Sequence, residues 1–410
     1  MQKCGGAVMS MLPAGNRIHY LVGSASLFHK QVLVPYDPLV CEFLNSVSRE
    51  LLQDTLARQY PDVISFGFWC RKANIHKLKE EFSETRLRLG LGLIFHIAPS
   101  NVPVNFAFSF AFSALSGDCN VVRVPSKEYP QTAIICGAIN KVLSDEKFRP
   151  IAKMTAFVRY ERDDEITQAF SEMCNGRIIW GGTQTIRNIR RLPVPERAIE
   201  VSFADRYSLC AINAERLLQC SDKELLSLAE GFYNDTYLMD QNACSSPHLV
   251  VWLSDGKALS GIRKRFWESV YKTAAARYVL APISAVDKLT MLCENAIESR
   301  GVLSVSRYEN LLYVLELNHL ANNMEELRGK AGFFYDVSVK TLDEIARIVN
   351  EKYQTLTYYG IEHDELVSFV LTNKLFGIDR IVPIGSAMDI SVIWDGYDLV
   401  RTLSRICDVK

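Results

Sequence analysis

Short apolar runs alternate with longer amphipathic runs between residues 89 and 212, and this alternation limits the chain to a few folds. The apolar runs "GLIFHIA", "NVVRV", "MTAFV", "GRIIW" and "YSLCAI" have the length and composition of buried strands. The intervening "VNFAFSFAFSALSG" has helical length, and Gly117 ends it as glycine often ends a helix. Strands and helices in turn predict a parallel sheet covered by helices.

The same rhythm continues beyond residue 222. The helix-like segments there are "DKELLSLAEGFYND", residues 257–277 and "LDEIARIVNEKY", and the strand-like segments are "LVVWL", "LLYVLEL", "FFYDVSV", "LTYYG" and "RIVPIG". Because 410 residues exceed the size of one compact core, we predict an α/β protein with two sheets. Residues 1–88 give no clear pattern.

The overall charge excludes a general attraction to nucleic acid or to anionic lipid. The formal net charge is -1 and the isoelectric point is near 6.7. The small basic runs "RNIRR" and "IRKRF" are typical of solvated helix faces. No stretch reaches 18 consecutive apolar residues, so we expect neither a nucleic-acid partner nor a membrane span.

The cysteine pattern indicates a reducing compartment. The eleven cysteines include no CxxC pair, and the seven histidines show no HxxxH or CxxH spacing. We therefore expect no structural metal and no disulfide framework. The N-terminal segment also lacks the charged start and apolar run of a signal peptide, and we expect a cytoplasmic protein.

One cysteine, Cys244, lies in the polar loop "DQNACSSPH" and not in an apolar segment. A thiol in such a loop can ionise and be approached by a substrate, which a nucleophile requires. The alternative is an inert packed thiol. His248, four residues later, could pair with the thiol, although strand alternation after Pro247 favours a packed or surface histidine.

Nucleotide-binding signals are sparse. The chain has no GxxxxGK[ST] loop, and its glycines complete no GxGxxG. In "IIWGGTQTIRNI" a strand leads through Gly181, Gly182 and Thr183 into a helix, whose N-terminus could hold a pyrophosphate. An ordinary strand-to-helix turn would have the same pattern.

Four segments together resemble the aldehyde dehydrogenase superfamily, and most closely its acyl-CoA reductase branch of the LuxC type. "FHIAPSNVPVNF" resembles the Pro-Trp-Asn-x-Pro turn, "GDCNVVRVPSK" the segment that ends in Lys-Pro-Ser-Glu, "IIWGGTQ" the Phe-Thr-Gly-Ser turn, and "DQNACSSPH" the nucleophile loop. The most branch-specific segment is "RIVPIGSAMDISVIWDGYDLVRTLSR". The resemblance covers residues 89–410.

This resemblance implies an aldehyde-dehydrogenase-like fold, with two parallel-sheet α/β domains and an active-site cleft between them. We expect residues 1–205, joined by about 378–410, to form the cofactor domain. Residues 206–377 then form the catalytic domain, which carries Cys244.

The resemblance also implies the site residues. Cys244 is the nucleophile, the amide of Asn101 donates to the oxyanion, and Glu200 matches the general base of hydrolytic members, although Ser202 and Phe203 replace the glycines that follow it there. Without the resemblance, Asn101 would be taken as a turn residue. The expected cofactor-binding residues are Ser100, Arg123, Pro125, Ser126, Lys127, Gly181, Gly182 and Thr183. Cys119 could also lie near the cofactor.

Two departures from the superfamily pattern bear on the cofactor. Val124 replaces the lysine that contacts a ribose, so Arg123 or another residue must supply that contact. Lys127 stands where many NAD-linked members carry a glutamate that accepts the ribose hydroxyls, and a cation there suits a 2'-phosphate. We expect NADPH as the cofactor, with NADH as the alternative.

The predicted activity is reduction of a fatty acyl thioester, from CoA or an acyl carrier, to a fatty aldehyde through an acyl thioester on Cys244. An acyl-protein synthetase is a candidate partner, and we expect an assembly of identical subunits. One alternative is an NAD(P)-dependent aldehyde dehydrogenase that forms the acid with Glu200 as base. The other is a non-catalytic acyl-binding subunit.

Overall fold

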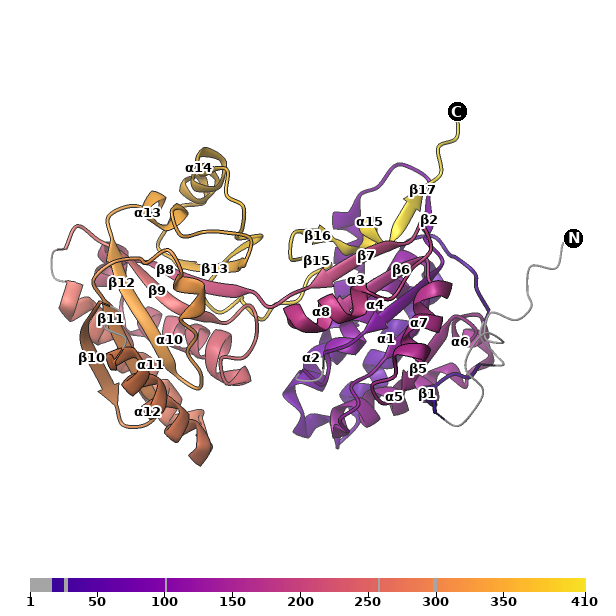
Figure 1. Cartoon of the computed structure of the whole chain (residues 1–410), viewed down its shortest axis with the longest axis horizontal. Coiled ribbons are helices and arrows are strands. Elements are labelled where there is room, and N and C mark those ends of the chain that lie inside the picture. Colours follow the sequence, from indigo (N-terminus) through magenta and orange to yellow (C-terminus); the bar gives the residue numbers. More distant parts are fainter. Residues whose placement is uncertain (1–16, 26–28, 100–101, 257–258, 298–300) are drawn as a thin grey trace, which may run out of the picture. The chain divides into compact units, whose positions relative to one another are not determined.

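The chain folds into two compact units, each of which is described by itself (Figure 1). The computed structural model describes residues 17–25, 29–99, 102–256, 259–297 and 301–410. Unit 1 holds the residues up to Ala204 together with Ile390–Lys410, and unit 2 is Asp205–Asp389. The second boundary lies later than the expected 377/378, because β14 (Arg380–Pro383) pairs in parallel with β13 (Tyr353–Tyr359) of unit 2.

Unit 1 is built on a six-stranded sheet with the order β1-β5-β4-β3-β6-β7. All neighbours pair in parallel except the edge strand β1, which is antiparallel to β5. The strands are β1 (His19–Val22), β3 (Leu93–Ile97), β4 (Cys119–Arg123), β5 (Thr155–Arg159), β6 (Gly176–Trp180) and β7 (Ile199–Phe203). A small separate sheet joins β2 (Arg88–Gly90) to β17 (Ser404–Ile406), and another joins β15 (Ile393–Trp394) to β16 (Tyr397–Asp398).

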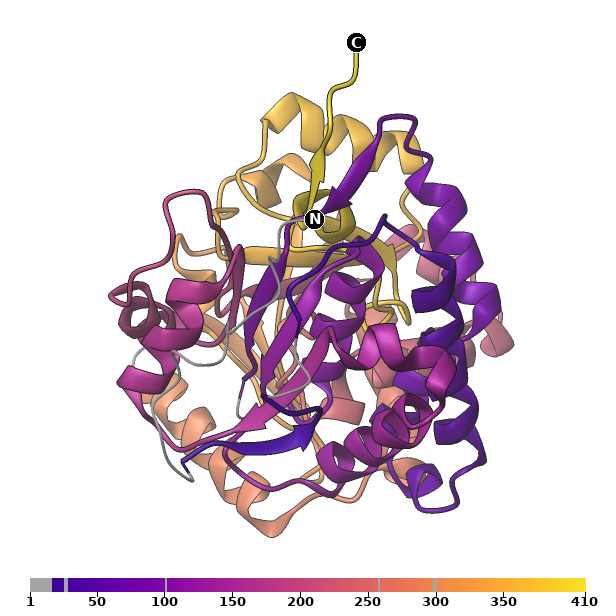
Figure 2. The ribbon, with the colours of Figure 1, turned by 90° about the vertical axis from the view of Figure 1, so that its right-hand side faces the viewer.

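Helices cover both faces of this sheet (Figures 1 and 2). Apolar residues of α1, α2, α4, α5 and α15 form one core with Ile94, Val122 and Phe157, and residues of α7 and α8 form the other with Phe95 and Val121. Alternate strand residues therefore point to opposite cores, as the pleat requires. The helices are α1 (Pro38–Gln53), α2 (Pro61–Trp69), α3 (Lys72–Phe82), α4 (Asn105–Ser116), α5 (Pro130–Leu143), α6 (Arg149–Ala152), α7 (Asp164–Met173), α8 (Thr183–Arg190) and α15 (Leu399–Thr402).

The strand order of unit 1 determines where a ligand can bind. From β3 the chain steps outward to β4 and β5, then crosses to the other side for β6 and β7. This is the order of a dinucleotide-binding sheet, in which ligands bind beyond the carboxyl ends of the strands where the direction reverses. That point lies between β3 and β6, and β6 leads directly into Gly181 and Gly182.

Unit 2 contains a seven-stranded sheet with the order β10-β11-β12-β9-β8-β13-β14. Only β10 is antiparallel to its neighbour, so the strands from β11 to β14 run in one direction. The strands not yet given are β8 (Tyr207–Asn213), β9 (Pro247–Leu253), β10 (Val302–Tyr308), β11 (Leu312–Leu317) and β12 (Phe333–Val339).

Two layers of helices enclose this second sheet. Residues of α9, α10 and α11 pack with Trp252 and Phe334 on one face, and residues of α12, α13 and α14 pack with Leu249 and Tyr335 on the other. In Figure 1 the strands β11 and β12 can be followed beside α10, α11 and α12. The helices are α9 (Ala214–Gln219), α10 (Asp222–Thr236), α11 (Leu259–Arg277), α12 (Pro282–Ile297), α13 (Asp343–Ala346) and α14 (His363–Asn373).

The expected α/β fold with two parallel-rich sheets is confirmed, with one helix shorter than predicted. The segment "LDEIARIVNEKY" forms only the short α13, which ends at Ala346. Asn350 explains the early end, because its side-chain oxygen accepts the backbone N–H of Lys352 at 2.9 Å. Such a local bond offers the backbone an alternative to the helix, and it turns the chain into β13.

We predict that Phe110→Ala destabilises unit 1 by about 3 to 5 kcal/mol, because the ring is buried and its removal leaves a cavity. The ring packs against Phe157, with 5.0 Å between ring centroids, and against Phe43, with 6.3 Å. Urea unfolding followed by circular dichroism measures the change. Phe376→Ala is the control, since its side chain is 85% exposed and should cost less than about 0.5 kcal/mol. Equal effects of the two substitutions would contradict the packing described here.

Candidate active site

Cys244 lies at the amino-terminal edge of the sheet in unit 2, in the turn that leads into β9. Its side chain is partly exposed, whereas most of the other described cysteines are buried. The backbone at Asp240 and Gln241 has φ values of 50° and 62°, in the left-handed region. These two residues reverse the chain after the short helix η4 (Tyr237–Met239) and direct it back towards the strand.

A buried amide fixes this turn. The Gln241 side chain is 1% exposed, and its Nε2 donates to the carbonyl oxygens of Pro247 and Phe333 at 3.1 and 3.0 Å. Its Oε1 accepts the backbone N–H of Gly332 at 3.2 Å. One side chain therefore ties both ends of the nucleophile loop to the start of β12, and it leaves no buried amide group unpaired.

Ser208 connects the Cys244 backbone to a second strand. Its hydroxyl donates to the carbonyl oxygen of Cys244 at 2.6 Å and accepts the backbone N–H of Thr355 at 3.2 Å. Ser208 lies on β8, between β9 and β13, and is fully buried. The hydroxyl therefore fixes the cysteine relative to the start of β13.

The strand register is irregular on both sides of Ser208. Tyr353 and Leu356 of β13 pair with Tyr207 and Leu209, so three residue steps on β13 oppose two on β8. On the other side, Ser208 pairs with Pro247, and Leu209 pairs with Leu249, which leaves His248 as an extra residue. Bulges of this kind redirect side chains and occur often beside active sites.

The bulge in β13 presents Gln354 to the thiol. Its Nε2 donates to the Cys244 sulfur at 3.3 Å, and its Oε1 accepts the hydroxyl of Thr355 at 3.3 Å. Gln354 is 2% exposed. The partly exposed thiol therefore has a buried side-chain amide as its hydrogen-bond donor.

A pair of opposite charges shapes the neighbouring loop 384–389. The Arg380 guanidinium donates to the carbonyl oxygens of Ser386, Ala387 and Asp389, and the Asp235 carboxylate accepts the N–H groups of Gly385 and Ala387 at 2.6 and 2.9 Å.

This clamped loop adjoins the nucleophile loop. Ser246 donates its hydroxyl to the carbonyl oxygen of Asp235 at 2.7 Å, and Ser245 donates to the sulfur of Met388 at 3.7 Å. Burial lowers the pKa of Arg380, and the negative charges of Asp389, Asp235 and Cys244 oppose that shift. A partly buried cation therefore acts electrostatically on the thiol, and it favours the thiolate.

His248 is a packed residue, as strand alternation indicated. It is 4% exposed and stacks on Tyr207 with 5.4 Å between ring centroids. Burial lowers its pKa to about 3, so the imidazole is neutral near pH 7. A neutral, buried ring does not stabilise a thiolate as a cation would.

The predicted pyrophosphate turn lies at the carboxyl edge of the other sheet. Gly182 is the N-cap of α8, which begins at Thr183, and no side chain caps the first turn. A Cβ atom on Gly182 would meet nothing within 4 Å, while one on Gly181 would press on Thr185 at 3.0 Å. The N–H groups of the first turn, which lack partners within a helix, are therefore accessible to an anion.

Two cations lie at the same edge, Arg123 as the last residue of β4 and Lys127 in the loop after it. The Arg123 guanidinium lies over the Tyr160 ring at 4.4 Å, and the Lys127 ammonium lies 5.0 Å from the Tyr129 ring. Lys127 and Ser126 are exposed, and the carbonyl oxygen of Pro125 accepts from Arg159 at 3.2 Å.

Cys119, which we considered near the cofactor, is fully buried and donates its thiol to the carbonyl oxygen of Gln31 at 2.8 Å. Burial raises the pKa of this thiol to about 12, which makes it an inert packing residue.

Three further residues belong to the predicted site. Ser100 and Asn101 fall outside the described residues. Glu200 lies on β7, where its carboxylate accepts Arg177 at 2.6 and 2.9 Å and Arg190 at 2.6 Å. Two guanidinium groups thus hold this carboxylate, and a catalytic role for Glu200 stays a prediction without support from its contacts.

Sequence patterns missed four residues around the thiol: Ser208, Asp235, Gln354 and Arg380. Arg380 is in the strand-like segment "RIVPIG", Asp235 is within a predicted helix, and Gln354 falls between the segments "LDEIARIVNEKY" and "LTYYG". A strand register irregularity has no sequence signature in a single chain, so no signal could have indicated Gln354. Their proximity follows from the adjacent amino ends of β8, β9, β13 and β14.

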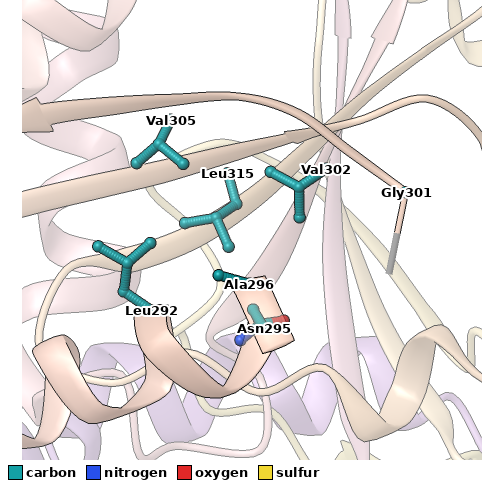
Figure 3. Close-up of a pocket in the computed structure, with 7 residues that line it drawn as sticks. All are labelled: Leu292, Asn295, Ala296, Gly301, Val302, Val305 and Leu315. Atoms are coloured by element: carbon teal, nitrogen blue, oxygen red, sulfur yellow. The ribbon is translucent and has the colours of Figure 1, made fainter. Parts of the chain in front are cut away.

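A separate pocket of about 380 Å³ lies between α12 and the strands β10 and β11 (Figure 3). Its walls are mainly apolar, with Asn295 as a polar exception, and Asn295 donates to the Tyr335 hydroxyl at 3.0 Å. The lining residues are Leu292, Asn295, Ala296, Gly301, Val302, Val305 and Leu315. None of these surrounds Cys244, so the pocket is distinct from the thiol site.

Within the described ranges, no cluster of three or more His, Cys, Asp or Glu residues is arranged to hold a metal ion. In the same part of the chain, no helix has the length and apolar character needed to cross a membrane.

Comparison with known families decides what kind of protein contains this site. The family profile described as acyl-CoA reductase (LuxC) matches residues 33–289. The chain belongs to this family. The match confirms the resemblance inferred from the sequence, and it identifies the chain as a member of an oxidoreductase family. A comparison with curated proteins gives no match.

Solved structures confirm the fold of this LuxC-family chain. An NAD-dependent aldehyde dehydrogenase from Sinorhizobium meliloti matches with a TM-score of 0.62 at 11% identity, covering 90% of this chain and 81% of that one. A salicylaldehyde dehydrogenase from Pseudomonas putida G7 matches with a TM-score of 0.61 at 14% identity, covering 92% and 85%. At these identities the likeness shows the aldehyde dehydrogenase fold and nothing more.

We predict that Asp235→Asn makes the stability of unit 2 less dependent on pH. Burial raises the pKa of Asp235 to about 7 from an ordinary value of 3.8, so the folded state holds this proton more tightly than the unfolded chain. The contribution to stability is then full below pH 4 and is lost as the pH rises through 7. The wild type should lose about 1 kcal/mol per pH unit over this window relative to the variant.

Urea unfolding between pH 4 and pH 8 tests this expectation, with Asp287→Asn at an exposed position of α12 as the control. The expectation is wrong if Asp235→Asn and the wild type show the same pH dependence.

Proposed function

We propose that this LuxC-family protein reduces a fatty acyl thioester to the fatty aldehyde, with Cys244 as the nucleophile. The observation that supports this best is a partly exposed thiol that accepts a buried amide donor, near a partly buried guanidinium. Such surroundings favour a thiolate, which is the form that attacks a carbonyl. A scaffold protein that only binds acyl groups would have no use for this arrangement.

The first half-reaction transfers the acyl group to the protein. The Cys244 thiolate forms a bond from Sγ to the acyl carbon, and the bond from that carbon to the sulfur of CoA or of an acyl carrier breaks. The leaving thiolate takes up a proton. The backbone of the nucleophile loop is held by Ser208 and Gln241, so Sγ stays in place while the substrate exchanges.

The second half-reaction releases the aldehyde. A bound nicotinamide supplies the hydride that reduces the acyl carbon. The oxyanion on that carbon then re-forms the carbonyl, the bond to Sγ breaks, and Cys244 returns to the thiolate. Because the acyl group passes through the protein, acyl transfer should follow ping-pong kinetics.

The residues of unit 1 fit a dinucleotide. The uncapped first turn of α8 faces open space at Gly182, next to the strand-order reversal between β3 and β6. These N–H groups would hold the pyrophosphate, with Thr183 at the start of the helix. Arg123, the last residue of β4, and Lys127, in the loop after it, would lie near the ribose groups.

Lys127 favours NADPH over NADH. Its ammonium is exposed beyond the carboxyl end of β4, where a 2'-phosphate could pair with it. A glutamate at this position would instead accept the hydroxyls of NADH.

Oxidation of aldehyde to acid is the less favoured alternative. It requires a base that activates water, and the Glu200 carboxylate is already held by Arg177 and Arg190. A long-chain acyl substrate and an acyl-protein synthetase as its donor agree with the family, and they remain part of the proposal.

We predict that Cys244→Ser abolishes both acyl labelling and aldehyde formation. The wild type, incubated with a radiolabelled long-chain acyl-CoA, should retain label on the protein and, with NADPH, form an aldehyde that is trapped and identified. Loss of the thiolate should lower the rate by at least about 1,000-fold, because a serine hydroxyl is a far weaker nucleophile at neutral pH.

Cys293→Ser is the matched control, since Cys293 is an exposed thiol on α12 and should be dispensable. Retention of label in Cys244→Ser would show that another residue is the nucleophile. Oxidation of an aldehyde without turnover of any acyl thioester would refute the reductase proposal and direct attention to Glu200.

We also predict that Lys127→Glu reverses the cofactor preference. The new carboxylate repels a 2'-phosphate, so KM for NADPH should rise at least about tenfold while KM for NADH falls or stays the same. Steady-state kinetics with each cofactor, beside Lys77→Glu on α3 as an exposed control, provide the measurement. An unchanged ratio of the two KM values would exclude Lys127 from the cofactor site.

A further inference from the structure

Four residues form a closed ring of contacts around the thiol. From the Cys244 carbonyl oxygen the ring runs to the Ser208 hydroxyl at 2.6 Å and on to the Thr355 backbone N–H at 3.2 Å. Gln354 is the next residue along the chain, and its Nε2 returns to the Cys244 sulfur at 3.3 Å. The backbone of the cysteine is thus held by Ser208 of β8, and its sulfur is contacted by Gln354 of β13.

The orientation of the Gln354 amide follows from its second contact. The Thr355 hydroxyl donates to Oε1 at 3.3 Å, which places the oxygen end of the amide away from the sulfur. The NH2 end therefore points to Sγ. This end can only donate hydrogen bonds, so it stabilises a thiolate more strongly than a thiol.

The strand geometry shows that this contact is built into the fold. The extra residue in β13 between Tyr353 and Leu356 falls at Gln354 and Thr355, directly opposite Ser208. In a regular strand, successive side chains alternate between the two faces of the sheet. The bulge departs from this alternation and turns Gln354 towards the thiol.

The same donor lies where an oxyanion must form. After attack, the acyl oxygen is attached to the carbon bonded to Sγ, so a donor on the same side of Sγ is within its reach. Gln354 is 2% exposed and its donor is preorganised by Thr355. A fixed donor in a dry site stabilises a developing oxyanion far more than water does.

We propose that the Gln354 side-chain amide is a catalytic hydrogen-bond donor, to the Cys244 thiolate before attack and to the oxyanion on the acyl carbon after attack. The oxyanion part rests on the proposed acyl-transfer function, whereas the thiolate part does not. Gln354 and Cys244 belong to the same unit, so the donor accompanies the nucleophile.

The test compares Gln354→Met and Gln354→Glu with the wild type and with Gln219→Met, an exposed control on α9. Alkylation of Cys244 by iodoacetamide is followed by mass spectrometry across pH, with the exposed Cys293 as an internal reference. Tryptophan fluorescence and thermal unfolding establish that each variant is folded. Steady-state reduction of acyl-CoA is measured in parallel.

In Gln354→Met, the pH at which Cys244 is alkylated at half its maximal rate should rise by about one unit, because the thiolate loses its donor. In Gln354→Glu it should rise further, because a carboxylate repels the thiolate. Turnover in the presence of saturating substrate should fall by about 100-fold to 1,000-fold in both variants, with a smaller change in KM. A residue with only a structural role would not shift the alkylation profile of a folded variant.

The outcomes separate the two proposals. If folded Gln354 variants keep the alkylation profile and the turnover of the wild type, the role of Gln354 is overturned while acyl labelling of Cys244 stands. If the wild type takes up no acyl label, the proposed function fails, and the alkylation profile still decides whether Gln354 stabilises the thiolate. If Gln354→Met and Gln354→Glu both fail to fold, Gln354→Asn replaces them in the test. Its shorter side chain withdraws the donor from Sγ, so the pH at which Cys244 is alkylated at half its maximal rate must rise.

Discussion

The hydrogen bonds of Ser208 are the constraint on which the thiol site depends. One buried hydroxyl joins the backbone of the nucleophile loop to the start of β13, between two strand irregularities. If β8 paired regularly with both neighbours, His248 and Gln354 would follow the ordinary alternation of a strand. The contact of Gln354 with Cys244 therefore depends on the irregular pairing of β8 with β13.

The two units use opposite edges of similar sheets. In unit 1 the turn that we propose as an anion site follows β6, at the carboxyl ends of the strands, where open α/β sheets bind their ligands. In unit 2 the thiol precedes β9, and Ser208, Gln354 and Arg380 lie at the amino ends of their strands. Parallel strands place all their amino ends along one edge of the sheet. Residues that are distant in the sequence therefore become neighbours there.

Much of this could be predicted from the sequence, for physical reasons. Buried strands of a parallel sheet are nearly continuous apolar runs, so β3, β4, β6 and β9 were legible. The polar surroundings of Cys244 in the sequence identified the loop. Its partners were not predictable, because Gln354 falls between two assigned segments of the sequence and its orientation depends on an extra residue relative to β8. The helix that we predicted over residues 342–353 does not extend to Asn350, whose side chain bonds to the local backbone.

The hydrogen bonds between Asp235 and loop 384–389 determine which fragment of the chain can fold as unit 2. A fragment that ends at 377 would lack β14 and the N–H groups of Gly385 and Ala387, which accommodate a buried carboxylate. That carboxylate would lose its donors in an apolar environment, at a cost sufficient to unfold a marginally stable domain. A fragment that is meant to express unit 2 alone must therefore extend to Asp389. A circular permutant should likewise keep residues 235 and 389 in the same segment.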